Sequence, residues 1–203
     1  MMEYLFRDVC HVLKNKQDKY IRAFNYASCE KWLCNELCQL INDDIFMGTG
    51  SEIYCYDEVF KTDITVYKDD GNYTVPKDDR DNLLINIEVK LLYPKTQILK
   101  KKGRIIELVN KLDKLKKENN CNIKNEGWVF CIWTDYYMKN SKTLTNANVS
   151  YDEFKNKVFS ELKKIGYSIE LEQIIDGTIN YRLDEQGMIR KKAIRVNAFR
   201  LTV

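Results

Sequence analysis

Long apolar runs, paired cysteines and histidine are scarce in this sequence, and each absence narrows the range of proteins it can encode. No apolar run approaches the ~20 residues that a membrane-spanning helix needs, and the first residues lack the basic-then-apolar order of a secretory signal. We therefore expect a cytoplasmic protein without a membrane partner. The sequence contains no internal repeat and no low-complexity tract, so a single domain is expected for its 203 residues.

The spacing of the cysteines does not indicate disulfides. The seven cysteines are an odd number, contain no CxxC pair, and several lie in apolar periodic segments where a thiol packs as a small hydrophobe. A zinc site would need Cys29, Cys34 and Cys38, with His11 as the single histidine of the chain. Structural zinc sites rarely take three ligands from one helix, so packing is the favoured role of these cysteines.

Positive charge is concentrated in one segment, although the net charge is only +3. Between Lys95 and Lys117, nine Lys or Arg residues stand against two acids, and a second basic group lies near the C-terminus. Such clusters are typical of proteins that bind polyanions, although a solvated helix face gives the same pattern. The candidates for contact with nucleic acid are Lys100, Arg104, Lys111 and Lys114.

Apolar periodicity divides the chain into helices and strands. Helical spacing predicts two helices between Glu3 and about Ile41, one from Gln97 to about Glu118, and one over 151–166. Alternating or continuous apolar runs predict strands at 52–60, 61–67, 83–93, 127–137, 167–174, 178–183 and 191–203. This order predicts an α/β (α+β) fold in which a mixed central β-sheet is flanked by helices.

Charged residues interrupt two of the predicted strands. Asp63 begins the strand that ends at Tyr67, and Glu88 and Lys90 share one face of the apolar run over 83–93. If these strands pair as an antiparallel hairpin, two carboxylates and an ammonium converge at one end of the sheet. Burying adjacent carboxylates is costly unless a cation lies between them, and Mg²⁺ is commonly held by one or two carboxylates with water and phosphate oxygens. Lys90 would then orient or deprotonate the attacking water, or stabilise charge on a phosphate.

Two glutamates in the preceding helix are candidates to complete this site. At helical spacing, Glu30 points along the middle of the apolar side, and Glu36 lies at its edge beside Trp32. Each charge also has a purely structural interpretation. Glu88 and Lys90 would be a pair on a solvated sheet face, Asp63 a strand-start acid, and Glu30 a first-turn acid favoured by the helix dipole. The apolar flanks of Glu88 and Lys90 favour the site.

The order "TD" and then "EVK" on the next strand, after a helix with an inward glutamate and before a basic helix, resembles the PD-(D/E)XK nuclease superfamily, which has the restriction-endonuclease-like fold. The resemblance covers roughly 28–136, the core of one nuclease-like domain over 1–203, with a further helix and strands over 150–203. It implies that Asp63, Glu88 and the Val89 carbonyl bind Mg²⁺ or Mn²⁺ and that Lys90 assists the attacking water. Glu30 or Glu36 would complete the site. Thr62 replaces the proline of the motif.

The resulting hypothesis is a metal-dependent endonuclease, a hydrolase of phosphodiester bonds, with DNA favoured over RNA. The resemblance suggests restriction or another anti-phage role, and a homodimer that cuts both strands. Two alternatives remain open. One is a non-catalytic nucleic-acid-binding or interaction module with a relict nuclease fold. The other is a viral cap-snatching-type RNA endonuclease, in which His11 would be the helix histidine at the metal.

Overall fold

A six-stranded mixed sheet forms the centre of the protein. The computed structural model describes residues 3–26, 30–46, 53–57, 62–68, 82–94, 103–118, 123–140, 143–146, 149–182 and 189–202. The strands lie in the order β1 (Ile53–Asp57), β2 (Ile64–Lys68), β3 (Leu83–Leu92), β4 (Lys124–Thr134), β8 (Ile189–Thr202) and β7 (Ser168–Arg182). β3 and β4 run parallel, and the other neighbours run antiparallel.

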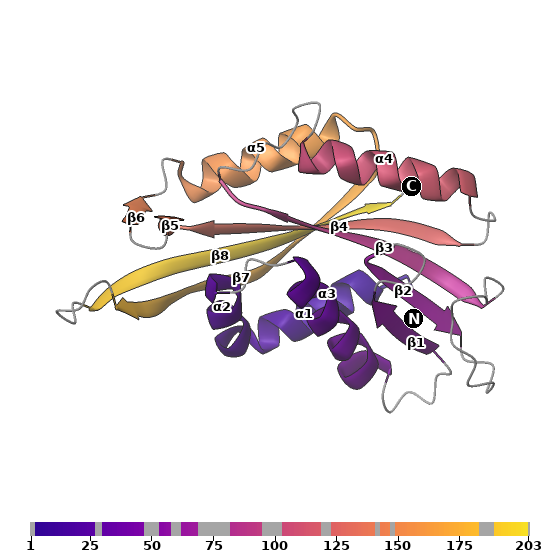
Figure 1. The fold of residues 1–203 in the computed structure, drawn as a ribbon, viewed down its shortest axis with the longest axis horizontal. Helices are drawn as coiled ribbons and strands as arrows, with labels where there is room; N and C mark the ends of the chain where they lie inside the picture. The colour runs from indigo at the N-terminus through magenta and orange to yellow at the C-terminus, as the bar shows by residue number, and fades with distance from the viewer. Residues whose placement is uncertain are drawn as a thin grey trace.

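Helices cover both faces of this sheet (Figure 1). One face is covered by α1 (Leu5–Asn15), α2 (Gln17–Tyr26), α3 (Glu30–Leu40) and the π-helical turn η1 (Ile41–Phe46), and the other by α4 (Arg104–Glu118) and α5 (Tyr151–Lys163). A separate hairpin pairs β5 (Tyr136–Asn140) with β6 (Thr143–Asn146). The predicted α/β (α+β) class, with a mixed sheet flanked by helices, is confirmed. No helix within the described residues is long and apolar enough to cross a membrane.

Several predicted element boundaries are wrong. The strand expected at 127–137 is β4, which runs from Lys124 to Thr134, and β5 begins separately at Tyr136. The segment before Ile41 forms three α-helices rather than two, because α1 ends at Asn15 and α2 begins at Gln17. This break lets both helices pack against β7. β7 is one long strand rather than two, since it pairs with β8 through Gly177, which the sequence pattern marks as a break. A Cβ at Gly177 would lie 2.8 Å from Cδ1 of Ile21, so the glycine permits α2 to approach the strand.

The two sheet faces carry separate hydrophobic clusters. The first lies under α1–α3 and includes Ile85, Ile87 and Val89 of β3; the second lies under α4 and α5 and includes Leu92. Because side chains alternate along a strand, Ile85, Ile87, Val89 and Leu91 of β3 face the first cluster and Leu92 faces the second. This explains the nearly continuous apolar run of β3, which is buried on both faces.

The paired length of β2 exposes part of the edge of β3. The β2–β3 register places Ile64 opposite Ile87, so the residues of β3 from Glu88 to Leu92 extend beyond the start of β2. On the other edge, β3 pairs with β4 through Leu92. The backbone groups of β3 that point toward β2 therefore need other partners beyond Ile87. α3 and the residues just before β2 supply them.

Candidate active site

Asp63 lies where β2 begins, beside the extended end of β3. Its Oδ2 accepts a hydrogen bond from the amide of Val89 over 2.8 Å. The side chain thus replaces the strand partner that Val89 would otherwise have. The antiparallel pairing of β2 with β3, predicted from the sequence, places Asp63 beside the row of Glu88.

Glu30 reaches the same edge from the first turn of α3. Its Oε2 accepts from the amide of Leu91 over 3.1 Å, and Nη1 of Arg104 contacts its Oε1 at 2.5 Å. Leu91 is two residues beyond Val89 in β3, so Glu30 and Asp63 satisfy successive amides on one strand edge. The inward position predicted for Glu30 brings it to the other candidate residues.

Glu36 lies elsewhere on α3 and does not reach this edge through any contact of the described residues. It accepts hydrogen bonds from Lys19 at 2.5 Å and from Tyr20 at 2.9 Å. Partial burial alone would raise the pKa of Glu36, but these hydrogen bonds outweigh it and lower the pKa. Its role is therefore to join α3 to α2, and of the two candidate glutamates the structure brings Glu30 to the site.

Lys90 lies between the acids at the edge of β3. Its Nζ donates to the carbonyl oxygen of Val89 over 2.9 Å and lies 3.6 Å from Oδ2 of Asp63 and 3.8 Å from Oε2 of Glu30. The N–H and C=O of one strand residue point to the same side, so the Val89 carbonyl faces the edge that β2 leaves open, as its amide does. The side chain of Lys90 is 13% exposed.

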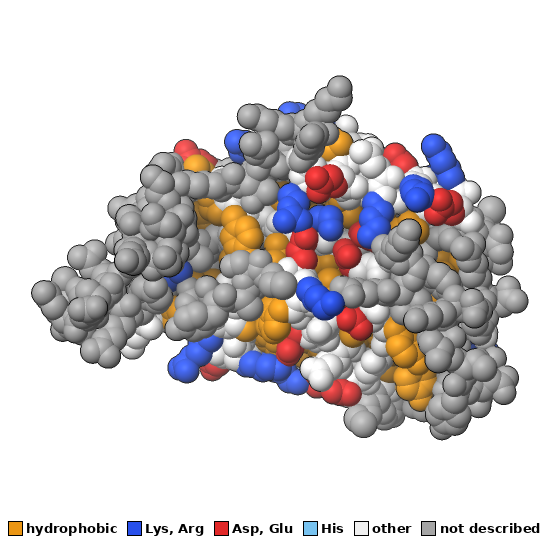
Figure 2. Space-filling view, viewed as in Figure 1, with side chains coloured by type: hydrophobic (Ala, Val, Ile, Leu, Met, Phe, Trp, Pro, Cys, Tyr) orange, Lys and Arg blue, Asp and Glu red, His pale blue; other side chains and the backbone are white. Residues whose placement is uncertain are grey.

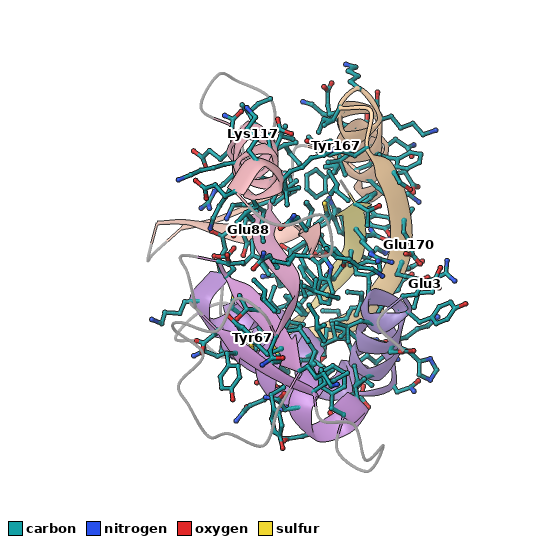
Figure 3. All side chains as sticks on the ribbon, turned by 90° about the vertical axis from the view of Figure 1, so that its right-hand side faces the viewer. Glu3, Tyr67, Glu88, Lys117, Tyr167 and Glu170 are labelled. Carbon is teal, nitrogen blue, oxygen red and sulfur yellow. The ribbon has the colours of Figure 1, made fainter. Side chains whose placement is uncertain are left out.

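Glu88 points to the face of the sheet that α4 covers, on the same edge as Asp63 (Figure 3). Its carboxylate is fully buried, and Nζ of Lys111 lies 2.5 Å from Oε2. Lys111 is the one donor at Oε2, and Oε1 has no donor in the part of the chain that the structure describes. Burial, with the negative charge of Asp63, raises the pKa of Glu88 to about 7 in spite of Lys111. A buried carboxylate with one ammonium at one oxygen and no donor at the other is only partly satisfied.

The four candidates for contact with nucleic acid differ in their exposure and in the residues they pair with. Arg104 pairs with Glu30 and Lys111 with Glu88, so both are partners of site acids. Lys114 is exposed on α4 and lies 3.6 Å from Glu118, whereas Lys100 is outside the described residues. The pairing of Arg104 and Lys111 with acids was not predicted. Their spacing of seven residues, which places both on one face of a helix, is the signal that could have revealed it.

Acidic and basic side chains are interleaved in a band below α4 (Figure 2). The three acids of the site, Glu30, Asp63 and Glu88, are matched by three cations, which are Lys90, Arg104 and Lys111. A divalent cation would take the carboxylates of Asp63 and Glu88 and the Val89 carbonyl as ligands, with other positions for water or substrate. These hard oxygen ligands fit Mg²⁺ and Mn²⁺. No cluster of three or more His, Cys, Asp or Glu side chains suited to a metal occurs among the described residues.

His11 is not brought to these acids. Its ring lies 2.8 Å from the side-chain amide of Asn15, and it lines a groove between α1 and β7 with Arg7, Glu172 and other residues. β7 forms the far edge of the sheet from β1 and β2. Figure 3 accordingly shows Glu170 of β7 on the opposite side from Glu88. The arrangement gives no support to a metal site that contains His11.

The described cysteines are buried free thiols, as expected for packing residues. Cys38 and Cys55 approach each other to 3.1 Å between α3 and β1. Cys34, one turn before Cys38, lies close enough to the site that Asp63 adds to burial in raising its thiol pKa. Cys29 and Cys121 lie outside the described residues, so the zinc ligand set that includes Cys29 cannot be placed.

A buried acid that the sequence analysis overlooked lies in β4. Glu126 contacts Nη2 of Arg200 at 2.5 Å and accepts a hydrogen bond from Nε1 of Trp128 over 2.9 Å. Both oxygens therefore have a partner, which indicates a structural role. Glu126 therefore differs from Glu88, whose Oε1 has no donor among the described residues.

No protein-family model matches the chain, and a search of curated proteins finds no match. The functional argument therefore depends on the geometry of these residues.

Proposed function

We propose that this protein is a metal-dependent endonuclease of the PD-(D/E)XK type, a hydrolase of phosphodiester bonds with DNA as the favoured substrate. The observation that carries the proposal is the state of Glu88. It is a fully buried carboxylate beside a second carboxylate, with one ammonium at Oε2 and no donor at Oε1 among the described residues. Purely structural acids are normally satisfied, as Glu126 is. A divalent cation between Asp63 and Glu88 would relieve their repulsion.

The residues of the chain have separate tasks in this proposal. Asp63, Glu88 and the Val89 carbonyl would hold Mg²⁺ or Mn²⁺, which supplies positive charge where negative charge develops on the phosphate. Lys90 would orient the attacking water or stabilise the phosphate, because its ammonium already lies against the Val89 carbonyl. Glu30 and Asp63 hold this ammonium in position from two sides.

Nucleic acid would approach along α4. Lys114 presents an exposed cation there, and Arg104 and Lys111 lie on the helix face beside the acids. Neutralising phosphates with these residues would make binding fall as salt rises. The resemblance suggests a role in restriction or anti-phage defence in the cytoplasm. It also suggests a homodimer that cuts both strands.

The second candidate is a non-catalytic nucleic-acid-binding module. It is favoured by one observation, that each of the three acids already has a cation of the chain within 4 Å. Such a set of ion pairs is stable without a metal, as a relict site would be. Metal binding distinguishes this candidate from the nuclease.

The test is cleavage of plasmid DNA and of a labelled single-stranded RNA in Mg²⁺, in Mn²⁺ and in EDTA. Wild type is compared with Lys90→Ala and with Lys164→Ala, an exposed lysine of the C-cap of α5 that pairs with Glu161. We expect metal-dependent cleavage that Lys90→Ala abolishes and Lys164→Ala retains. A folded wild-type protein that cuts neither substrate and binds no Mn²⁺ in calorimetric titration would refute the nuclease.

A further inference from the structure

The three acids of the candidate site are not held equally. Glu30 and Asp63 each accept a backbone hydrogen bond from β3, from Leu91 and from Val89. Glu88 accepts no backbone hydrogen bond from the described residues, and its one partner there is the Lys111 ammonium, 2.5 Å from Oε2. The charge of Glu88 thus depends on a single ammonium, whereas the charges of the other two acids are also stabilised by the backbone.

The two members of this pair also differ in their freedom to move. The Glu88 side chain is fully buried, while the Lys111 side chain is 35% exposed on α4. Lysine has a flexible four-carbon stem, so its ammonium can move into water without a change in the helix. Glu88 has no such exit. A competing cation would therefore displace Lys111 and leave Glu88 in place.

The position of α4 brings Lys111 close to the sheet. Glu88 lies opposite Gly127 of β4, and a Cβ at Gly127 would lie 3.0 Å from Leu108 and Leu112 of α4. The absence of this Cβ lets α4 pack closely on β4. The helix backbone is thus fixed by packing, and the mobile part of Lys111 is its side chain.

We propose that Lys111 is the resident counter-cation of Glu88, and that a divalent cation binds to Glu88 only by displacing the Lys111 ammonium. Lys111 then sets the concentration of divalent cation at which the site fills. The inference rests on the proposed function, because it concerns the metal site proposed there. The displaced ammonium remains on α4, where it can pair with a phosphate oxygen of the substrate. Arg104 cannot take this role toward Glu30 in the same way, since Glu30 keeps its bond from Leu91 when Arg104 leaves.

The experiment is calorimetric titration of the full chain with MnCl₂ at pH 8.5. Wild type is compared with Lys111→Met, Lys111→Gln and Lys111→Arg. Lys111→Gln removes the charge but can still donate to Glu88, so it serves if Lys111→Met does not fold. The matched control is Lys155→Met, because Lys155 has a similar exposure of 30% and pairs with an acid on its own helix, α5.

Loss of a positive charge a few ångströms from a divalent cation should strengthen Mn²⁺ binding by roughly tenfold or more. We expect this gain in Lys111→Met and Lys111→Gln, with Lys111→Arg and Lys155→Met within twofold of wild type. Neutral variants that bind Mn²⁺ no more tightly than wild type would overturn the inference and leave the metal site intact. If neither wild type nor any variant binds Mn²⁺, the inference and the proposed nuclease both fail.

Discussion

The amide of Val89 donates a hydrogen bond to Oδ2 of Asp63, 2.8 Å away, at the point where β2 no longer covers the edge of β3. The carboxylate accepts the hydrogen bond that a carbonyl of a neighbouring strand would otherwise accept. The carbonyl of the same residue, Val89, receives the ammonium of Lys90. An incomplete sheet edge thus places an acid, a cation and a backbone oxygen within a few ångströms of one another, which is what a site for a divalent cation and a phosphate requires.

Asp63→Asn should separate the structural and metal-binding roles of this residue. The amide oxygen of asparagine can still accept from Val89, so we expect the free energy of unfolding to change by less than about 1 kcal/mol. The lost charge should weaken Mn²⁺ binding by at least tenfold, on the order of the 1.4 kcal/mol or more that one ligand charge contributes. Urea denaturation and calorimetric titration measure the two effects. Unchanged Mn²⁺ affinity in a folded Asp63→Asn variant would exclude Asp63 as a ligand.

Glu88 should make the stability of the metal-free protein depend on pH. Its folded pKa of about 7 lies above the ordinary value of 4.5, so the folded state binds more protons between these values. Stability is therefore highest below pH 4.5 with respect to this group and falls as pH rises through 7. With about 1.4 kcal/mol per unit, the loss is on the order of 3 kcal/mol.

The matched variant is Glu88→Gln, which cannot ionise. We expect its urea unfolding free energy, in EDTA, to lack this decrease between pH 5 and pH 8.5, so that it exceeds wild type at the higher pH. A wild-type profile parallel to that of Glu88→Gln would show that the carboxylate titrates at its ordinary pKa. Because Mn²⁺ requires the ionised form, wild type should also release protons on binding Mn²⁺ at pH 6 and few at pH 8.5.

Glu30→Gln should reduce activity, whereas Glu36→Gln should reduce stability alone. Glu30 positions Lys90 and accepts a hydrogen bond from the Leu91 amide, so we expect Glu30→Gln to reduce metal-dependent cleavage by roughly tenfold or more. Glu36 holds Lys19 and Tyr20, so Glu36→Gln should cost about 1 kcal/mol of unfolding free energy and leave cleavage unchanged. Cleavage rates and urea midpoints of the two variants show which glutamate contributes to activity and which to stability. Loss of cleavage in Glu36→Gln alone would reverse the assignment.

The positions of the candidate residues that the structure brings together depend on short-range regularities. The period of two in a strand, together with a hairpin, is enough to place Asp63 beside the row of Glu88, and the helical period is enough to turn Glu30 inward. The partners of these acids depend on packing between distant segments. Lys111 reaches Glu88 only because α4 crosses above β3, and Glu126 meets Arg200, 74 residues later, only because β8 pairs with β4.

Element boundaries failed where a residue had a tertiary role that resembles a local break. Gly177 weakens a strand by its own propensity, yet β7 continues through it by pairing with β8, and the missing side chain leaves room for Ile21.

The side chain of Lys90 also differs from the expectation. It was expected on the face of Glu88, but its long side chain returns to the strand edge and meets Asp63 and Glu30. Alternation predicts the direction of a Cβ and not the position of an ammonium several bonds away.

Gly127→Ala should show how closely α4 must approach the sheet. The new Cβ would lie 3.0 Å from side-chain carbons of Leu108 and Leu112, so the helix or these leucines must move by a few tenths of an ångström. We expect a loss of about 1–2 kcal/mol in unfolding free energy from overpacking, after allowance for the stiffer unfolded chain. Gly166→Ala is the control, since that glycine has a φ of 81° and nothing within 4 Å of its added Cβ, so any cost there comes from the backbone alone. Leu108→Ala should cost less in the Gly127→Ala background than in wild type, because the shortened side chain leaves room for the new Cβ. A Gly127→Ala variant as stable as wild type would mean that α4 tolerates displacement from β4, and that its packing does not hold Lys111 at Glu88.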